Sequence, residues 1–142
     1  MLQLTSQHQD DIAAHGESDY PYECCGLLIG HFAGDGRKVV TETYPISNAR
    51  EEAAKRNRFL IRPEELLQGE RYAAAKDLDI IGFYHSHPDD QAVPSQYDLE
   101  HAWPAYSYII VSVRNGQRED FRSWEMRADR SRFDEEEIVR QT

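Results

Sequence analysis

Three short apolar runs, separated by polar and glycine-containing segments, constrain the fold of this chain most strongly. A short, continuous apolar run is typical of a β-strand that is buried on both faces. Segments with helix-start signals lie before, between and after these runs. Strands that alternate with helices predict an α/β domain of two or three layers, in which helices flank a mixed sheet. The three runs are Cys25–Gly30, Leu78–Tyr84 and Tyr106–Val113.

Capping residues predict three helices. The first begins at Thr5 and ends near Gly16, and the third opens at Ser95. The second begins at Pro63, because proline suits the first turn of a helix, and it runs to about Lys76.

Glycine-rich turns predict two hairpins. Gly34-Asp35-Gly36 returns the chain through a strand over 39–44, and Asn115-Gly116 returns it through a strand over 121–124. The remaining expectations are a surface loop over 47–57, a short strand over 59–61 and a charged terminal helix over 133–139.

Length and charge limit the organisation and the partners. The chain has 142 residues, which predicts one domain over 1–142. It has 16 lysines and arginines against 26 acidic residues, a formal net charge of −10. This charge disfavours nucleic acid and anionic membrane surfaces as partners, because both need a basic face. Met1-Leu2-Gln3-Leu4 does not resemble the start of a signal peptide, so we expect a cytoplasmic protein.

The two cysteines carry no metal or redox motif. Cys24 and Cys25 are adjacent, and the chain contains no CxxC pair. Thiolate zinc sites and thioredoxin-like chemistry are therefore disfavoured. We expect both cysteines to behave as small apolar residues at the start of a buried strand.

Histidines at alternate positions suggest a metal site. His85 and His87 follow an apolar strand directly, and residues i and i+2 of an extended chain point to the same face. Two imidazoles placed in this way can converge on one ion. The other early histidines, His8, His15 and His31, are expected to be structural or solvent-facing.

A third ligand is available just downstream. Ser95-Gln96-Tyr97-Asp98 has the pattern of a helix start, with serine at the N-cap and an acid three residues later. An aspartate in that first turn completes a His-His-Asp set, which leaves a fourth tetrahedral position for water. Spacing alone leaves Asp89, Asp90 and His101 as competing ligands.

The combined motif resembles a known family. His85-Ser86-His87-Pro88, seven further positions to Ser95, and then Asp98 match the HxHx₇Sx₂D signature of the JAMM/MPN-plus zinc metalloproteases. The segment Pro21–Gly30, which contains Glu23, resembles the glutamate-bearing segment of the short prokaryotic members. The resemblance covers the whole chain and implies the JAMM/MPN, cytidine-deaminase-like architecture. Nothing in the motif departs from the family pattern.

The resemblance implies a role for each motif residue. His85, His87 and Asp98 correspond to the ligands of one zinc ion per chain, and Glu23 corresponds to the general base. Ser95 corresponds to the hydroxyl that stabilises the oxyanion.

The implied reaction is hydrolysis of the amide bond after the C-terminal glycines of a ubiquitin-like or sulfur-carrier protein. In such relatives the Gly-Gly tail lies extended beside an edge strand. Two alternatives belong to other classes: a non-enzymatic ubiquitin-like-binding module, and a RadC-type DNA-associated protein. The intact Glu23 argues against the first, and the charge of −10 argues against the second.

Overall fold

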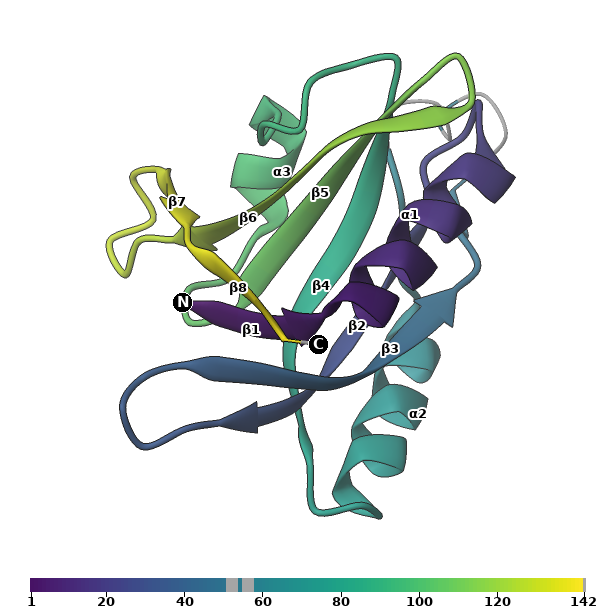
Figure 1. The fold of residues 1–142 in the computed structure, drawn as a ribbon. Helices are drawn as coiled ribbons and strands as arrows, with labels where there is room; N and C mark the ends of the chain where they lie inside the picture. Colours follow the sequence, from purple (N-terminus) through teal and green to yellow (C-terminus); the bar gives the residue numbers. More distant parts are fainter. Residues whose placement is uncertain (51–53, 55–57, 142) are drawn as a thin grey trace.

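The structure, a computed structural model, describes residues 1–50, 54 and 58–141. These residues form eight strands and three helices, whose arrangement is drawn in Figure 1. In chain order they are β1 Leu2–Thr5, α1 Ser6–Asp19, β2 Cys25–Phe32, β3 Lys38–Ile46, α2 Pro63–Ala74, β4 Asp79–Pro88, α3 Gln96–His101, β5 Ser107–Arg114, β6 Gln117–Met126, β7 Phe133–Glu136 and β8 Ile138–Gln141.

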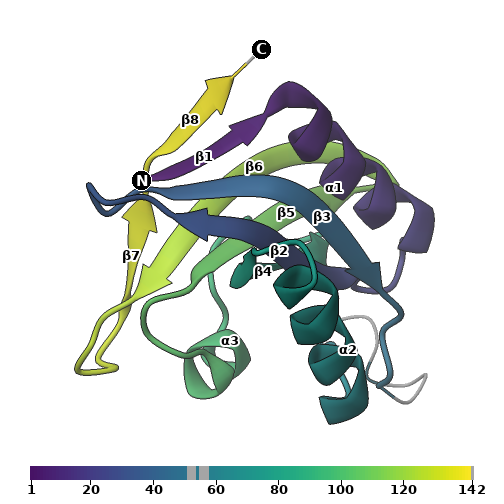
Figure 2. The same cartoon turned by 90° about the horizontal axis from the view of Figure 1, so that it is seen from below.

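All the strands belong to one curved, mixed sheet. Its order is β7-β6-β5-β4-β2-β3-β1-β8. β4 pairs in parallel with β5, whereas β2 is antiparallel to both of its neighbours. Helix α1 covers one face of the sheet, and α2 and α3 lie on the other (Figure 2). The predicted α/β fold, with helices on both sides of a mixed sheet, is therefore confirmed.

The central strands are buried on both faces, as their apolar runs predict. On β2, Leu28 packs into the core beneath α1, while its neighbour Leu27 packs into the core beneath α2. Both leucines are fully buried. This double burial fixes β2 and β4 at the centre of the sheet, with Glu23 just before β2 and His85 and His87 near the end of β4.

Helix α1 runs on to Asp19, three residues past the predicted end at Gly16. Gly16 is a packing residue rather than a helix stop. A Cβ added there would lie 3.1 Å from Val113 Cγ2 and 3.2 Å from Ser86 Cβ. The glycine thus lets α1 approach the sheet closely.

Other boundaries also differ from the sequence prediction. Strand β1 was not expected, and residues 59–61 do not form a strand. Phe59 and Ile61 instead pack onto the core beneath α2, while the Leu60 carbonyl accepts a hydrogen bond from the Ala49 amide at 3.0 Å. The predicted loop over 47–57 lies partly outside the described residues. Among the described residues, no helix combines the length and apolarity that a membrane crossing requires.

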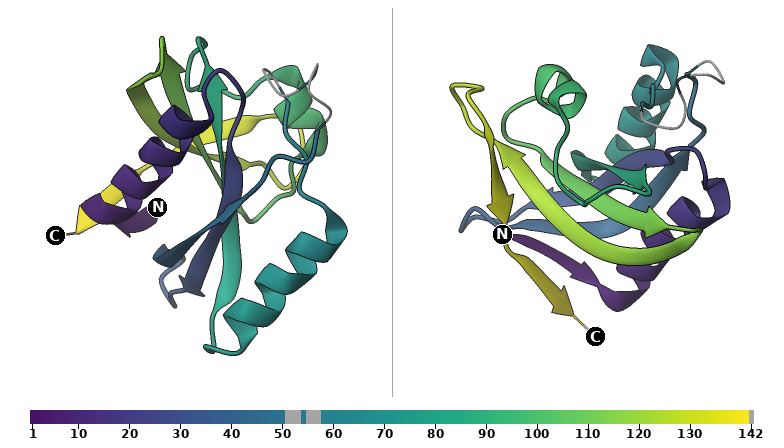
Figure 3. Two further views of the ribbon diagram at one scale, coloured as in Figure 1. Left: turned by 90° about the vertical axis from the view of Figure 1, so that its right-hand side faces the viewer. Right: turned by 90° about the horizontal axis from the view of Figure 1, so that it is seen from above.

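The predicted helix over 133–139 is wrong, because this segment forms β7 and β8. Its glutamate-rich sequence suits a helix locally. Pairing of β7 with β6 and of β8 with β1 satisfies its backbone in the sheet instead. Glu137 alone separates β7 from β8, so the two edge strands of the curved sheet are consecutive in the chain (Figure 3).

A buried ion pair between Glu136 of β7 and Lys38 of β3 stabilises the place where the two edge strands meet in the chain. Glu136 is 5% exposed, and its Oε2 lies 3.0 Å from the Nζ of the buried Lys38 on β3. Its Oε1 accepts hydrogen bonds from the Ser107 and Ser123 hydroxyls at 2.6 and 2.8 Å. Burial favours the neutral acid, but the Ser107 hydroxyl, Lys38 and the Ser123 hydroxyl hold the pKa of Glu136 below its ordinary value.

We expect Glu136→Gln to lower the free energy of unfolding at pH 7 by about 2 kcal/mol, because it removes one of the two carboxylates, Glu136 and Glu125, that pair with the buried Lys38. A lowered carboxyl pKa gives stability that is present above the ordinary value of about 4.3 and is lost as the pH falls through the folded-state pKa. The difference from wild type should therefore shrink below about pH 4. Urea titrations at pH 7 and in the acid range measure the free energy of unfolding of both proteins, with a substitution of an exposed residue, Glu135→Gln, as the control. A difference that does not change with pH would contradict this account.

Candidate metal centre

Strand β4 presents two histidines side by side. His85 and His87 are two residues apart, so their side chains leave the same face of the sheet. The two Nε2 atoms lie 3.1 Å apart, and the residues are 2% and 5% exposed. The two imidazoles therefore converge, as the sequence predicts.

Helix α3 brings the third group. Asp98 lies in its first turn, and its Oδ2 is 3.2 Å from His85 Nε2 and 3.1 Å from His87 Nε2. The Ser95 amide also donates to this oxygen at 2.9 Å. The capping box that begins α3 therefore also fixes the carboxylate against the two imidazoles.

The spacing of these three atoms fits a tetrahedral metal ion. Donor atoms about 2.0–2.1 Å from an ion, at tetrahedral angles, lie about 3.3 Å from one another. The three observed separations are 3.1–3.2 Å. Among the described residues, His85, His87 and Asp98 form the group of side chains whose ligand atoms converge in this way.

Electrostatics keep the carboxylate charged. Burial favours the neutral acid, but His85 and His87 hold the pKa of Asp98 well below its ordinary value. Burial likewise opposes a charge on His87, yet the hydrogen bond that its Nε2 donates to Asp98 raises the pKa of that imidazole. The anionic Asp98 thus favours a positive charge at the point where the three groups meet.

Neighbouring groups orient the two rings. His87 Nδ1 lies 2.7 Å from the Gln91 carbonyl oxygen, so it donates its N–H there and leaves the Nε2 lone pair for a metal. The His85 ring stacks on Phe59, with centroids 4.7 Å apart. Sequence reasoning missed the Gln91 carbonyl, because a backbone acceptor has no residue signature.

Glu23 lies beside this group, just before β2. Cys25 pairs with His85, and the Ser86 amide donates to the Cys24 carbonyl at 3.3 Å. Continued for one more residue, this antiparallel register sets Glu23 opposite His87. Glu23 is 3% exposed, and its Oε1 has no hydrogen-bond partner among the described residues. Burial, followed by repulsion from Asp98 and Asp90, raises the pKa of Glu23 to about 9.

Ser95 caps the helix that carries Asp98. Its Oγ accepts a hydrogen bond from the Asp98 amide at 3.1 Å. An accepting hydroxyl still has its own proton to donate. The cap and a donor role toward a substrate oxygen are therefore compatible.

The competing ligands lie elsewhere. Asp89 accepts a hydrogen bond from the Tyr20 hydroxyl at 2.6 Å, and Asp90 accepts one from the Gln91 amide at 2.8 Å. His101 is exposed, with its Nδ1 2.8 Å from the Tyr97 carbonyl. None of the three joins the converging group.

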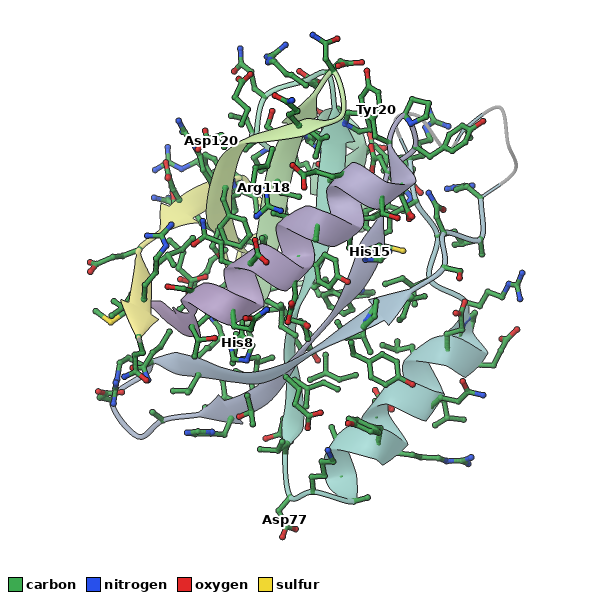
Figure 4. All side chains as sticks on the ribbon, turned by 45° about the vertical axis from the view of Figure 1, so that its right-hand side comes forward. His8, His15, Tyr20, Asp77, Arg118 and Asp120 are labelled. Carbon is green, nitrogen blue, oxygen red and sulfur yellow. The ribbon has the colours of Figure 1, made fainter. Side chains whose placement is uncertain are left out.

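The remaining histidines and the cysteines have the expected structural roles. His8 forms the capping box of α1 with Thr5, and His31 is exposed. His15 lies farther along α1 (Figure 4) and contacts the sheet. Cys24 and Cys25 are free and fully buried, and burial raises the pKa of both thiols.

Comparisons with known proteins identify the family of this chain. Residues 5–127 match the family of prokaryotic homologs of the JAB domain. A desampylase from Haloferax volcanii is 38% identical over 116 residues, which are 78% of this chain and 80% of that protein. A CysO-cysteine peptidase from Mycobacterium tuberculosis is 31% identical, over 80% of this chain and 74% of that protein.

A solved structure extends the likeness to almost the whole chain. A protein from Desulfitobacterium hafniense, solved in solution, superposes with a TM-score of 0.85 at 31% identity, over 99% of this chain and 93% of that one. The match to the JAB family, two named peptidase relatives and a buried His-His-Asp group lead to the same conclusion. The chain belongs to the prokaryotic branch of the JAB, or JAMM/MPN, family.

Proposed function

We propose that this protein is a zinc metallo-isopeptidase or peptidase that hydrolyses the amide bond after the C-terminal glycines of a ubiquitin-like or sulfur-carrier protein. The observation that carries the proposal is the tetrahedral spacing of His85, His87 and Asp98 beside the buried Glu23, whose Oε1 has no hydrogen-bond partner among the described residues. Residues 1–142 act as one unit. We place the protein in the cytoplasm, in keeping with the free thiols of Cys24 and Cys25.

Zinc suits the donor set, because two imidazoles and one carboxylate leave a fourth tetrahedral position open. When bound, zinc supplies an acidified water and polarises the scissile carbonyl. His85, His87 and Asp98 hold it, with one ion per chain. The Gln91 carbonyl keeps His87 in the tautomer that this ligation needs.

Glu23 moves the proton. It takes a proton from the attacking water and returns it to the leaving amine, a task for a general acid–base placed within hydrogen-bond reach. His87 and Asp98 would hold a cation beside Glu23, and its charge would favour the charged form of Glu23 and oppose the effect of burial on its pKa. Ser95 donates its hydroxyl to the oxygen that becomes negative during the attack.

An apolar groove beside the site suits the glycine tail. It has a volume of about 230 Å³ and is lined by residues 59–61, by side chains of α2, α3 and the sheet, and by Trp103. Phe59 lines this groove and also stacks on His85, so the groove leads to the metal centre. We place the Gly-Gly tail there, extended beside residues 59–61 in the manner of an added strand.

Removal of one ligand tests the metal assignment. We expect about one zinc per chain in the wild type, and we expect His87→Ala to lose it because two ligands do not complete the site. Elemental analysis after dialysis against a weak chelator measures the content. His101→Ala, which alters a histidine outside the group, should keep its zinc. A His87→Ala protein that still holds one tightly bound zinc would refute the assignment and make His101 or Asp89 the alternative ligand.

A further inference from the structure

The side chain of Asn48 uses its full hydrogen-bonding capacity on backbone groups. Its Nδ2 donates to the Glu23 carbonyl at 3.0 Å and to the Arg58 carbonyl at 3.0 Å. Its Oδ1 accepts from the Arg50 amide at 3.0 Å and from the Leu60 amide at 3.1 Å. A side-chain amide has two N–H donors and one oxygen with two lone pairs, so every position is occupied. These partners also fix the orientation of the amide, because the opposite one would set its NH₂ group against two N–H donors.

The bond to Glu23 bears on the position of the general base. The Oε1 atom of Glu23 has no hydrogen-bond partner among the described residues, so its carboxyl takes its position largely from the backbone that carries it. The next residue, Cys24, is tied to β4, because its amide donates to the Ser86 hydroxyl at 2.8 Å and its carbonyl accepts from the Ser86 amide at 3.3 Å. Asn48 supplies the contact to the carbonyl of Glu23 itself. The backbone that carries the base is therefore held by both β4 and Asn48.

Two further bonds of Asn48 hold the wall of the groove assigned to the glycine tail. Residues 59–61 line that groove, and Asn48 binds the backbone of Arg58 and of Leu60. Backbone groups of successive residues in an extended chain point to opposite sides, so these bonds occupy one edge of the segment. The Phe59 carbonyl points to the other edge, where it accepts a hydrogen bond at 3.3 Å from a tyrosine hydroxyl of α3. Asn48 thereby leaves the edge that faces α3 and the groove for the tail.

We infer that Asn48 is a positioning residue, which sets the general base in register with the groove that receives the substrate tail. One side chain binds the backbone of Glu23 and the backbone of the groove wall, so a shift of one segment moves the other. A misplacement of about 1 Å between a bound substrate and a catalytic group lowers the rate by a factor on the order of 10². Asn48 acts through Glu23 and does not itself contact the reacting atoms. This inference rests on the proposed function.

The kinetic constants of Asn48→Ala test this role. The substrate is a ubiquitin-fold protein from the same genome that ends in Gly-Gly, joined to a labelled peptide through either its α-amine or a lysine side chain, whichever the wild type cleaves. We expect kcat to fall by a factor on the order of 10², with a smaller change in KM and an unchanged zinc content. Ser47→Ala, at the exposed neighbouring position, is the matched control and should keep the wild-type kcat. A rise in KM with an unchanged kcat would overturn the inference, because the groove would then depend on Asn48 and the base would not.

A double-mutant cycle separates positioning from general stability. If Asn48 acts through Glu23, Asn48→Ala should lower the single-turnover rate by no more than a few-fold in the Glu23→Gln background, where the base is already lost. A purely structural role of Asn48 would lower the rate by the same factor in both backgrounds, and this result would overturn the inference.

A second variant keeps the test valid if Asn48→Ala does not fold. Asn48→Asp has the same shape and still accepts from the Arg50 and Leu60 amides, but it sets a carboxylate oxygen against the carbonyls of Glu23 and Arg58. The same loss of kcat, and the same dependence on Glu23, are expected. Wild-type kcat in this variant would overturn this inference alone. Failure of the zinc-loaded wild type to cleave either conjugate would overturn the proposed function.

Discussion

Glu23→Gln is expected to lower kcat by a factor on the order of 10²–10⁴, the usual contribution of a general acid–base group. Glutamine has nearly the same shape and still hydrogen-bonds water, but it cannot accept a proton and pass it on. Zinc content should stay at the wild-type level, because Glu23 is not among the converging ligands. Single-turnover hydrolysis by zinc-loaded protein, with metal content measured on the same sample, gives the result.

The stability of the metal-free protein distinguishes a catalytic role of Glu23 from a structural role. Burial raises the pKa of Glu23 to about 9, above the ordinary value, so the metal-free fold loses stability as the pH rises between these two values. Glutamine has no proton to lose, so metal-free Glu23→Gln should be at least as stable as wild type at pH 8. Glu70→Gln, at an exposed position on α2, is the control for both measurements. Turnover by Glu23→Gln within a few-fold of wild type would refute the assignment and make Asp89 or Asp90 the candidate base.

Ser95→Ala is expected to damage catalysis far more than folding. Loss of an N-cap costs about 0.5–2 kcal/mol of stability. Loss of an oxyanion donor lowers kcat by a factor on the order of 10²–10³. Urea unfolding and steady-state hydrolysis at saturating zinc, on the same preparation, measure the two effects separately.

The chain offers a matched control for the cap. Thr5 begins α1 with the same reciprocal capping arrangement that Ser95 forms at α3, and it lies outside the metal centre. Thr5→Ala should therefore lose similar stability and keep its activity. Ser95→Thr keeps a hydroxyl and should recover much of the rate. If Ser95→Ala turned over at the wild-type rate while unfolding more easily, Ser95 would be a cap only.

The candidate site could be predicted from sequence because its signals are local. Alternation along an extended strand was sufficient to put His85 and His87 on one face. Asp98 needed the family motif, since Asp89, Asp90 and His101 were also within reach by spacing. The position of Glu23 beside His87 depends on the pairing of β2 with β4, which is a tertiary contact.

The fold was predictable where burial dominates the sequence pattern. Strands β2, β4 and β5 have continuous apolar runs and were found. Strand β1 is too short for its leucines to show a pattern, and its place in the sheet depends on two partners that are distant in sequence, β3 and β8. The segment 133–139 has helical composition, and distant contacts such as that of Glu136 with Lys38 override it. Prediction from local propensity was wrong for this segment, because pairing with distant strands decides its structure.

The consecutive edge strands have a consequence for the behaviour of the protein in a crowded solution. β7 and β8, which form the two edges of the sheet, are each four residues long. Short edges offer few backbone groups to a passing strand, and they protect a sheet from indiscriminate pairing and aggregation. The capture of an extended glycine tail proposed above needs this protection, because a long open edge would also pair with unfolded chains. The short edges thereby leave the groove beside residues 59–61 as the proposed place of strand-like recognition.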